Sequence, residues 1–74
     1  MSILTNANRI ERQTRIEEAV IRLLDKEDMK LNELAEKLRM TRRTLIVATG
    51  HLRKMHKIYY DGMYQTFRLR KDYV

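Results

Sequence analysis

The chain has 74 residues, which is enough for one small domain with a single hydrophobic core. Hydrophobic residues make up 43 % of it and charged residues 35 %, a composition that argues against a disordered chain. The absence of cysteine excludes disulfides, iron–sulfur clusters and thiolate chemistry. No stretch approaches the ~18 consecutive apolar residues of a membrane span, so we expect a soluble protein.

Residues that could form a catalytic site are scarce. The chain has one serine, Ser2, two histidines, His51 and His56, and two glycines, Gly50 and Gly62. It therefore lacks a phosphate-binding glycine loop and a nucleophile–base pair. The two histidines lie about 140° apart around a helix, which is poor spacing for one metal ion. We expect a binding protein rather than an enzyme, with no cofactor and no metal.

The positive charge is concentrated in the second half of the chain. Sixteen Lys and Arg residues against ten Asp and Glu residues give a net charge of +6 at pH 7. Residues 1–38 carry seven positive and eight negative side chains, whereas residues 39–74 carry nine positive and two negative ones. Solubility alone does not require this segregation, so the asymmetry favours a polyanionic partner such as nucleic acid.

An amphipathic helix is predicted from about Asn8 to Lys26, after an N-terminal arm formed by residues 1–8. Glu11 and Arg15 are four positions apart in the order that favours an ion pair on the exposed side of a helix. The apolar residues that recur with helical spacing, and are expected to face the core, are Ile16, Ala19, Val20, Leu23 and Leu24.

A second, shorter helix is predicted over residues 32–38, with Asn32 as its N-cap. A tight turn at residues 39–41 leads into a third helix over about residues 42–56, for which Thr41 is the expected N-cap. The side of the third helix that is expected to face the core consists of Leu45, Ala48, Thr49, Leu52 and Met55.

Residues 57–70 are predicted to form a hairpin that packs on a three-helix core of residues 9–56. Asp61 and Gly62 lie between two runs of aromatic and aliphatic residues. This dipeptide favours a two-residue type I′ turn, which needs positive φ at both positions. The strands should turn Ile58, Phe67 and Leu69 toward the helices, and Tyr64, Thr66, Arg68 and Arg70 outward.

This order of elements resembles the winged helix-turn-helix superfamily over about residues 10–70. The segment Leu31–Leu38 (LNELAEKL) is similar to the "ELAxxL" second helix of that superfamily. The segment Thr41–Leu45 (TRRTL) is similar to its "S/T-x-x-T-V" entry into the third helix. The resemblance implies a mainly α fold with a β-hairpin: three helices followed by a two-stranded wing.

Three positions depart from the pattern of the superfamily. Arg39 occupies the place of the glycine in the turn between the second and third helices, so we expect a less sharp or longer turn. His56 occupies the place of the glycine that usually ends the third helix, and we expect it to cap that helix. Thr49 stands where a leucine is common, which should thin the core beneath the third helix.

The resemblance implies sequence-specific binding of double-stranded DNA by a transcriptional regulator, with the third helix in the major groove and residues 58–69 as the wing. The outward side of the third helix is basic at both ends and aliphatic or small between them. Arginines near its start fit guanine or phosphate, and the aliphatic residues fit thymine methyl groups. The residues expected to contact DNA are Thr41, Arg42, Arg43, Thr44, Ile46, Val47, Gly50, His51, Arg53, Lys54, Lys57, Tyr64 and Arg68.

Two alternatives to DNA binding stay open. Aliphatic residues on a surface also cluster at protein interfaces, so Ile46 and Val47 could be the docking patch of a protein-interaction adaptor. The third possibility is RNA binding through the same basic side. Small free-standing regulators of this kind resemble those of bacteria, archaea and their viruses, which implies the cytoplasm of a prokaryotic or virus-infected cell. No membrane or small-molecule partner is evident.

Apolar residues outside the core side of the first helix point to a homodimer. Ile10 and Ile21 lie on a second side of this helix, and Ile3 and Leu4 precede it. Regulators of the superfamily often dimerise through this part of the chain, so we expect a homodimer here. The alternative is that Ile3 and Leu4 fold back on the domain.

Overall fold

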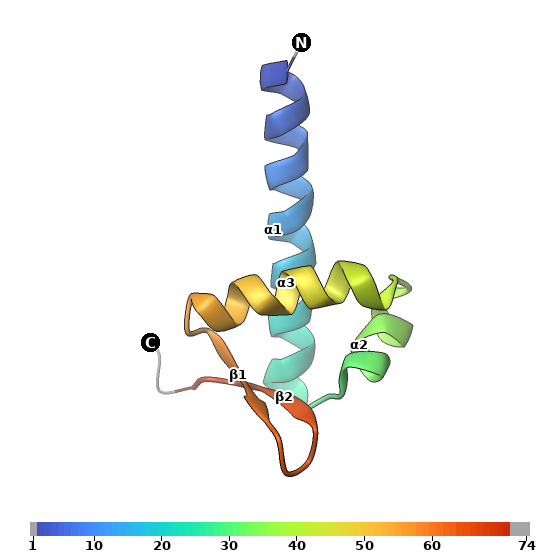
Figure 1. Cartoon of the computed structure of the whole chain (residues 1–74), viewed down its shortest axis with the longest axis vertical. Helices are drawn as coiled ribbons and strands as arrows, with labels where there is room; N and C mark the ends of the chain where they lie inside the picture. Colours follow the sequence, from blue (N-terminus) through green and yellow to red (C-terminus); the bar gives the residue numbers. More distant parts are fainter. Residues whose placement is uncertain (1, 72–74) are drawn as a thin grey trace.

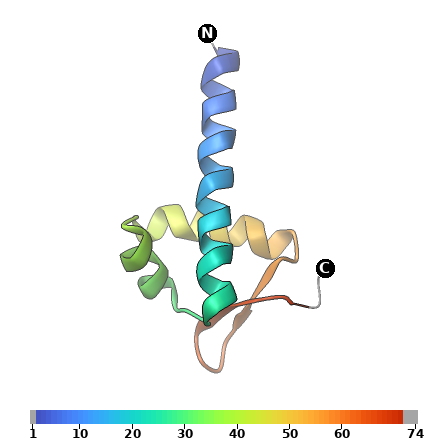
Figure 2. The same ribbon diagram turned by 180° about the vertical axis from the view of Figure 1, so that it is seen from behind.

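Three helices and one hairpin follow one another along residues 2–71, the part of the chain that our computed structural model describes; side chains are described from Ile10 onward. The helices are α1 (Ser2–Lys26), α2 (Leu31–Leu38) and α3 (Arg42–Lys54). Strands β1 (Ile58–Asp61) and β2 (Thr66–Leu69) pair antiparallel. This is the topology of a winged helix-turn-helix, so the predicted fold class is confirmed. α3 crosses α1, with α2 to one side and the hairpin at the C-terminal end of α1 (Figures 1 and 2).

Helix α1 is longer than predicted. It begins at Ser2, so the start at Asn8 was wrong and residues 2–8 belong to the helix rather than to an arm. Neither proline nor glycine occurs before Lys26, and each residue added to an existing helix gains a hydrogen bond without a new nucleation step. The N-terminal half of α1 extends past α3 and away from the other elements (Figure 1). The exposed pair of Arg15 and Glu11, at 3.0 Å, lies near the middle of α1.

The segment between α1 and α2 joins the hairpin. The N–H of Met29 donates to the carbonyl of Phe67 at 3.3 Å, and the N–H of Phe67 donates to the carbonyl of Met29 at 2.7 Å. Helix α2 then begins at Leu31 with Lys30 as the N-cap residue, so the predicted cap at Asn32 was wrong. The carboxylate of Glu33 accepts the N–H of Lys30 at 2.7 Å, which satisfies a donor that the first turn of a helix leaves unpaired.

Two helices end at a non-glycine residue with left-handed backbone. Arg39, at the end of α2, has φ 55°, and His56, just after α3, has φ 61°. The following residue closes each turn: Met40 donates to the carbonyl of Ala35, and Lys57 to that of Leu52, both at 3.0 Å. The turn at Arg39 is therefore as sharp as one with glycine, contrary to expectation. The C-cap of α3 is Met55, so the expectation that His56 caps this helix was wrong, and His56 is the left-handed residue that follows the cap.

Helix α3 is shorter than predicted. It ends at Lys54 instead of residue 56, with Met55 as its C-cap. Leu45, Ala48, Thr49 and Leu52 are buried as predicted, but Met55 is 45 % exposed because the backbone has already left the helix there. The hydroxyl of Thr49 donates to the carbonyl of Leu45 at 2.6 Å, so the hydroxyl has a partner at this buried position, where a leucine is common in the superfamily.

The hairpin turn differs from the predicted one. The loop spans residues 62–65, β2 begins at Thr66 rather than at Met63, and Gly62 does not have a positive φ; the left-handed residue is Gln65, with φ 56°. Oδ1 of Asp61 accepts the N–H groups of Met63 and Tyr64, at 2.9 and 3.4 Å. The side chain of Asp61 therefore organises a four-residue loop, and the two-residue type I′ turn was wrong.

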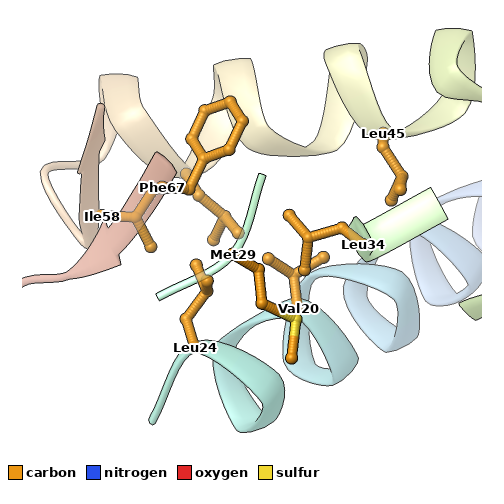
Figure 3. Packing of buried hydrophobic residues seen from close by; sticks show 8 residues of the cluster. Val20, Leu24, Met29, Leu34, Leu45, Ile58 and Phe67 are labelled. Carbon is orange, nitrogen blue, oxygen red and sulfur yellow. The ribbon is translucent and has the colours of Figure 1, made fainter. Parts of the chain in front are cut away.

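One core joins all five elements and the segment between α1 and α2. Figure 3 shows the side chains of this core converging between the helices and the hairpin. Ile58 and Phe67 are buried in it, and Leu69 is half-buried against it, as predicted. The buried residues of the cluster are Val20, Leu24, Met29, Leu34, Leu45, Leu52, Ile58 and Phe67. Within residues 2–71, no helix combines the length and apolar character needed to cross a bilayer.

Candidate nucleic-acid interface

The rotation of α3 about its axis is fixed by its buried residues. Leu45 and Leu52 are at most 1 % exposed, so the opposite side of the helix faces solvent. That side carries two exposed aliphatic residues in its middle, Ile46 at 55 % and Val47 at 59 %. The exposed residues along the helix, which we call the α3 surface, are Arg42, Arg43, Ile46, Val47, Gly50, His51, Arg53 and Lys54.

The N-terminus of α3 is both capped and basic. Oγ1 of Thr41 accepts the N–H of Thr44 at 3.2 Å, so Thr41 is the N-cap, as predicted. Arg42 and Arg43 occupy the first turn, which contains no acidic residue. Cations beside the positive end of a helix dipole are unfavourable by ~0.3–1 kcal/mol each, so local stability does not explain these arginines. The two side chains and the free N–H groups of the first turn could together bind an anion, since a helix N-terminus favours negative charge.

Gly50 lies exposed in the interior of α3. A Cβ atom built there meets nothing within 4 Å, and the backbone does not have a positive φ. Nothing within the chain therefore requires glycine, although glycine inside a helix costs ~1 kcal/mol relative to alanine. The absence of a side chain lets another molecule approach the axis of α3 closely at this point.

The C-terminal half of α3 is connected to the hairpin. The guanidinium carbon of Arg53 lies 5.8 Å from the centre of the Tyr60 ring. Tyr60 in turn packs edge-on against Phe67, with ring centres 5.1 Å apart. Arg53 is therefore held over an aromatic ring, while Lys54 is exposed and Lys57 is half-buried after the helix.

His51, one of the residues expected to contact DNA, is exposed and also has a partner within the chain. Its Nδ1 atom lies 2.8 Å from Oε2 of Glu17 on α1. The same carboxylate oxygen accepts the side-chain amide of Gln13 at 3.0 Å. His51 thus joins α3 to α1 and sits beside a carboxylate at the edge of the α3 surface.

Arg68 is also engaged within the chain. Its Nε atom lies 2.8 Å from Oδ2 of Asp28, and its Nη1 atom lies 3.4 Å from Oδ2 of Asp61. Asp28 is the main reason that the pKa of Arg68 is raised, and the neighbouring Tyr59 and Asp61 add to the effect. Its charge is largely compensated, so Arg68 is a poor candidate for a DNA contact. Tyr64, in the loop, is 65 % exposed.

The structure therefore brings most of the predicted contact residues onto one surface. Tyr64 and Arg68 lie apart on the hairpin. The predicted contact residues that belong to or border the α3 surface are Thr41, Arg42, Arg43, Thr44, Ile46, Val47, Gly50, His51, Arg53 and Lys54. No aspartate or glutamate occurs in α3. In the described part of the chain, no three His, Asp or Glu side chains gather as metal ligands would.

Fold and surface together define a winged helix-turn-helix domain with a basic third helix. Comparison of the chain with protein-family models, with curated proteins and with solved structures finds no match. The function must therefore be argued from the α3 surface itself.

Proposed function

We propose that the protein binds double-stranded DNA sequence-specifically and acts as a transcriptional regulator, with α3 in the major groove. The observation that carries the proposal is the charge of α3. The helix has cations at both ends, Arg42 and Arg43 in its first turn and Arg53 and Lys54 in its last, and no carboxylate between them. A major groove accommodates an α-helix, and the phosphates on its two sides attract cations at both ends of that helix.

The proposed roles follow from position along the helix. Arg42 and Arg43 are placed for bidentate contacts to guanine or phosphate, because they lie where the helix would enter the groove. Ile46 and Val47 would meet thymine methyl groups, and Gly50 would allow the backbone to approach the base edges. Each good bidentate pair contributes ~1–3 kcal/mol of discrimination between bases.

The remaining contacts would be to phosphates. Lys54 and Lys57 extend the basic surface beyond the base-reading half of α3, and Arg53 is held in place by Tyr60. On the hairpin, Tyr64 is the proposed contact because its side chain is exposed at the loop. Arg68 is omitted, since two carboxylates already bind it. These residues would set affinity and orientation rather than sequence preference.

Selection of bound duplexes from a random pool at fixed salt tests the proposal. Enrichment of a defined sequence is expected, and a palindromic consensus would further indicate a dimer. Binding of the selected duplex should weaken steeply as salt rises. Double-stranded RNA of the same sequence serves as the control, because its narrow major groove does not admit a helix. Equal binding of the RNA, or no enrichment at all, would contradict the proposal.

The adaptor alternative is favoured by one observation. Ile46 and Val47 are both more than half exposed and adjacent on α3. An aliphatic pair of this kind fits a protein partner as well as it fits thymine methyl groups. An adaptor would bind neither the selected nor the random duplex, so the selection experiment separates the two functions.

We also propose that the protein is a homodimer joined through the projecting half of α1. Ile10 lies on that half and is 67 % exposed. Ile21 does not belong to this seam, because it is half-buried and packs against the core. Ile3 and Leu4, which were expected to contribute, have side chains outside the described part of the structure. A dimer would place two copies of α3 on two half-sites of one duplex.

A further inference from the structure

A groove runs between α1 and the first half of α3. It consists of two hollows of 330 and 430 Å³ that share Arg12, Ile16 and Thr44 as lining residues. The first hollow extends along α3 to Val47 and Ala48. The second extends to Met40, in the turn before α3. We call these joined hollows the α1–α3 groove.

The floor of the α1–α3 groove is apolar. Ile16 is half-buried against the core, Ala48 is buried, and Val47 presents a side chain that is 59 % exposed. An apolar strip of this kind is favourably covered by apolar side chains of another molecule. DNA phosphates would not cover this apolar floor. We therefore expect a partner whose apolar side chains fill it.

The rim of the first hollow is cationic, whereas Arg15, which lines the second hollow, is paired with Glu11 at 3.0 Å. Arg12 on α1 and Arg43 on α3 flank the first hollow, and both are exposed. Neither guanidinium has a hydrogen-bond or ion-pair partner among the described residues. The occupant should therefore carry carboxylates beside its apolar groups. A second copy of this chain, with a net charge of +6, is a poor fit to this rim.

The form of the groove fits a helix. Its two hollows adjoin at Thr44; one extends back to Met40 and the other forward to Val47, so together they follow about two helical turns. Apolar residues three or four positions apart on a partner helix have the spacing to fill both hollows. Carboxylates on the flanks of that helix would reach Arg12 on one side and Arg43 on the other.

We propose that the α1–α3 groove binds an acidic amphipathic helix of a partner protein and that this binding excludes DNA from α3. The exclusion rests on the proposed function, because Arg43 and Val47 belong both to the groove and to the α3 surface. A carboxylate of the partner that engages Arg43 occupies the donors that would bind guanine or phosphate. The partner is therefore an antagonist of DNA binding.

The proposal is tested on the full chain by fluorescence anisotropy with a labelled, helix-constrained peptide of fourteen residues. This peptide has two leucines four positions apart and glutamates on both flanks. A scrambled peptide of the same composition and a peptide with lysines in place of the glutamates are the controls. The amphipathic acidic peptide should bind at least about tenfold more tightly than either control. Arg12→Ala should weaken its binding by about tenfold, whereas Arg22→Ala, an exposed arginine of α1 outside the groove, should not change it.

Competition with the selected duplex tests the exclusion. The peptide should displace DNA from the wild-type protein, and a ternary complex would overturn the exclusion. Equal binding of the scrambled peptide, or an Arg12→Ala variant that loses DNA affinity but not peptide affinity, would overturn the groove assignment. If DNA binds and the peptide does not, the inference fails and the proposed function stands. If the peptide binds and no duplex does, the groove stands and DNA binding fails.

Discussion

The carboxylate of Glu17 on α1 lies 2.8 Å from Nδ1 of His51 on α3. The contact ties α3 to the longest helix at the edge of the proposed DNA interface. Because the histidine side chain is 44 % exposed, water screens the pair and limits its contribution to stability. The pair therefore contributes little to the stability of the fold, and α3 is held in place mainly by its buried residues.

Glu17→Gln tests whether the pair affects stability or the placement of α3. We expect it to lower the free energy of unfolding by less than about 1 kcal/mol, because the contact is partly exposed. DNA affinity should be unchanged or slightly higher, because a negative charge beside the α3 surface is removed. Urea unfolding and binding isotherms measure the two quantities, with His51→Ala and the double variant completing a cycle. A clear loss of DNA affinity in a fully folded Glu17→Gln variant would mean that the pair sets the orientation of α3.

The left-handed residues at the helix ends predict stabilising substitutions. Arg39→Gly and His56→Gly should each raise the free energy of unfolding by about 1 kcal/mol, because glycine adopts φ near 60° without a Cβ clash. Arg39→Ala and His56→Ala are the matched controls and should give no such gain, since alanine keeps the clash. Chemical denaturation of the four variants checks this, and equal effects of glycine and alanine would rule out backbone strain at these sites.

The hairpin loop predicts that Asp61 matters more than Gly62. Asp61→Ala removes the acceptor of two backbone N–H groups and an ion-pair partner of Arg68, so it should destabilise the fold by ~1–2 kcal/mol. Gly62→Ala should change stability by less than about 0.5 kcal/mol, because its φ is not positive and a Cβ there meets nothing. Thermal melts compare the stabilities of the two variants. A larger loss of stability for Gly62→Ala than for Asp61→Ala would indicate that the type I′ turn forms after all.

The projecting half of α1 predicts how the dimer can be broken. Ile10→Glu should produce a folded monomer, because the side chain of Ile10 is 67 % exposed and does not belong to the core. Sedimentation and circular dichroism should show half the mass with unchanged helix content. Thr14→Glu, a second exposed position on α1, indicates how far the seam extends. A wild-type protein that is already monomeric at micromolar concentration would contradict the dimer.

The fold was predictable because its determinants are local and periodic. The stripe that includes Val20 and Leu24, the N-cap at Thr41 and the change of period after Lys57 all depend on neighbouring residues. The order of three helices and a hairpin followed from these features.

The details of the fold that differ from the prediction have other causes. One is that the same local sequence can form two different structures. Asp61 followed by Gly62 favours a two-residue turn, but an aspartate side chain can instead accept N–H groups further along the chain and organise a longer loop. The start of α1 had no breaker to mark it, and helix propagation decided it. The pairing of Met29 with β2 depends on Phe67, which is far away in the sequence.

For the site, the helical pattern predicted which residues of α3 face outward, but it could not predict which charges are compensated. Arg68 is paired with Asp28, forty positions earlier, and His51 with Glu17, thirty-four positions earlier. Such pairs depend on how the elements pack. Within α3 itself, the exposed lysine and arginine side chains lie at its two ends.

Binding isotherms of Arg43→Ala and Lys54→Ala, on the selected duplex and on random duplex at several salt concentrations, test DNA reading by α3 most directly. Arg43→Ala should lose ~1–3 kcal/mol on the selected duplex and little on the random one, as loss of a bidentate base contact does. Lys54→Ala should weaken binding to both duplexes equally and reduce the salt slope by about one phosphate contact. Both side chains are exposed, so the unfolding free energy should stay within ~0.5 kcal/mol of wild type. If both variants fold normally and bind both duplexes as the wild type does, α3 does not read DNA.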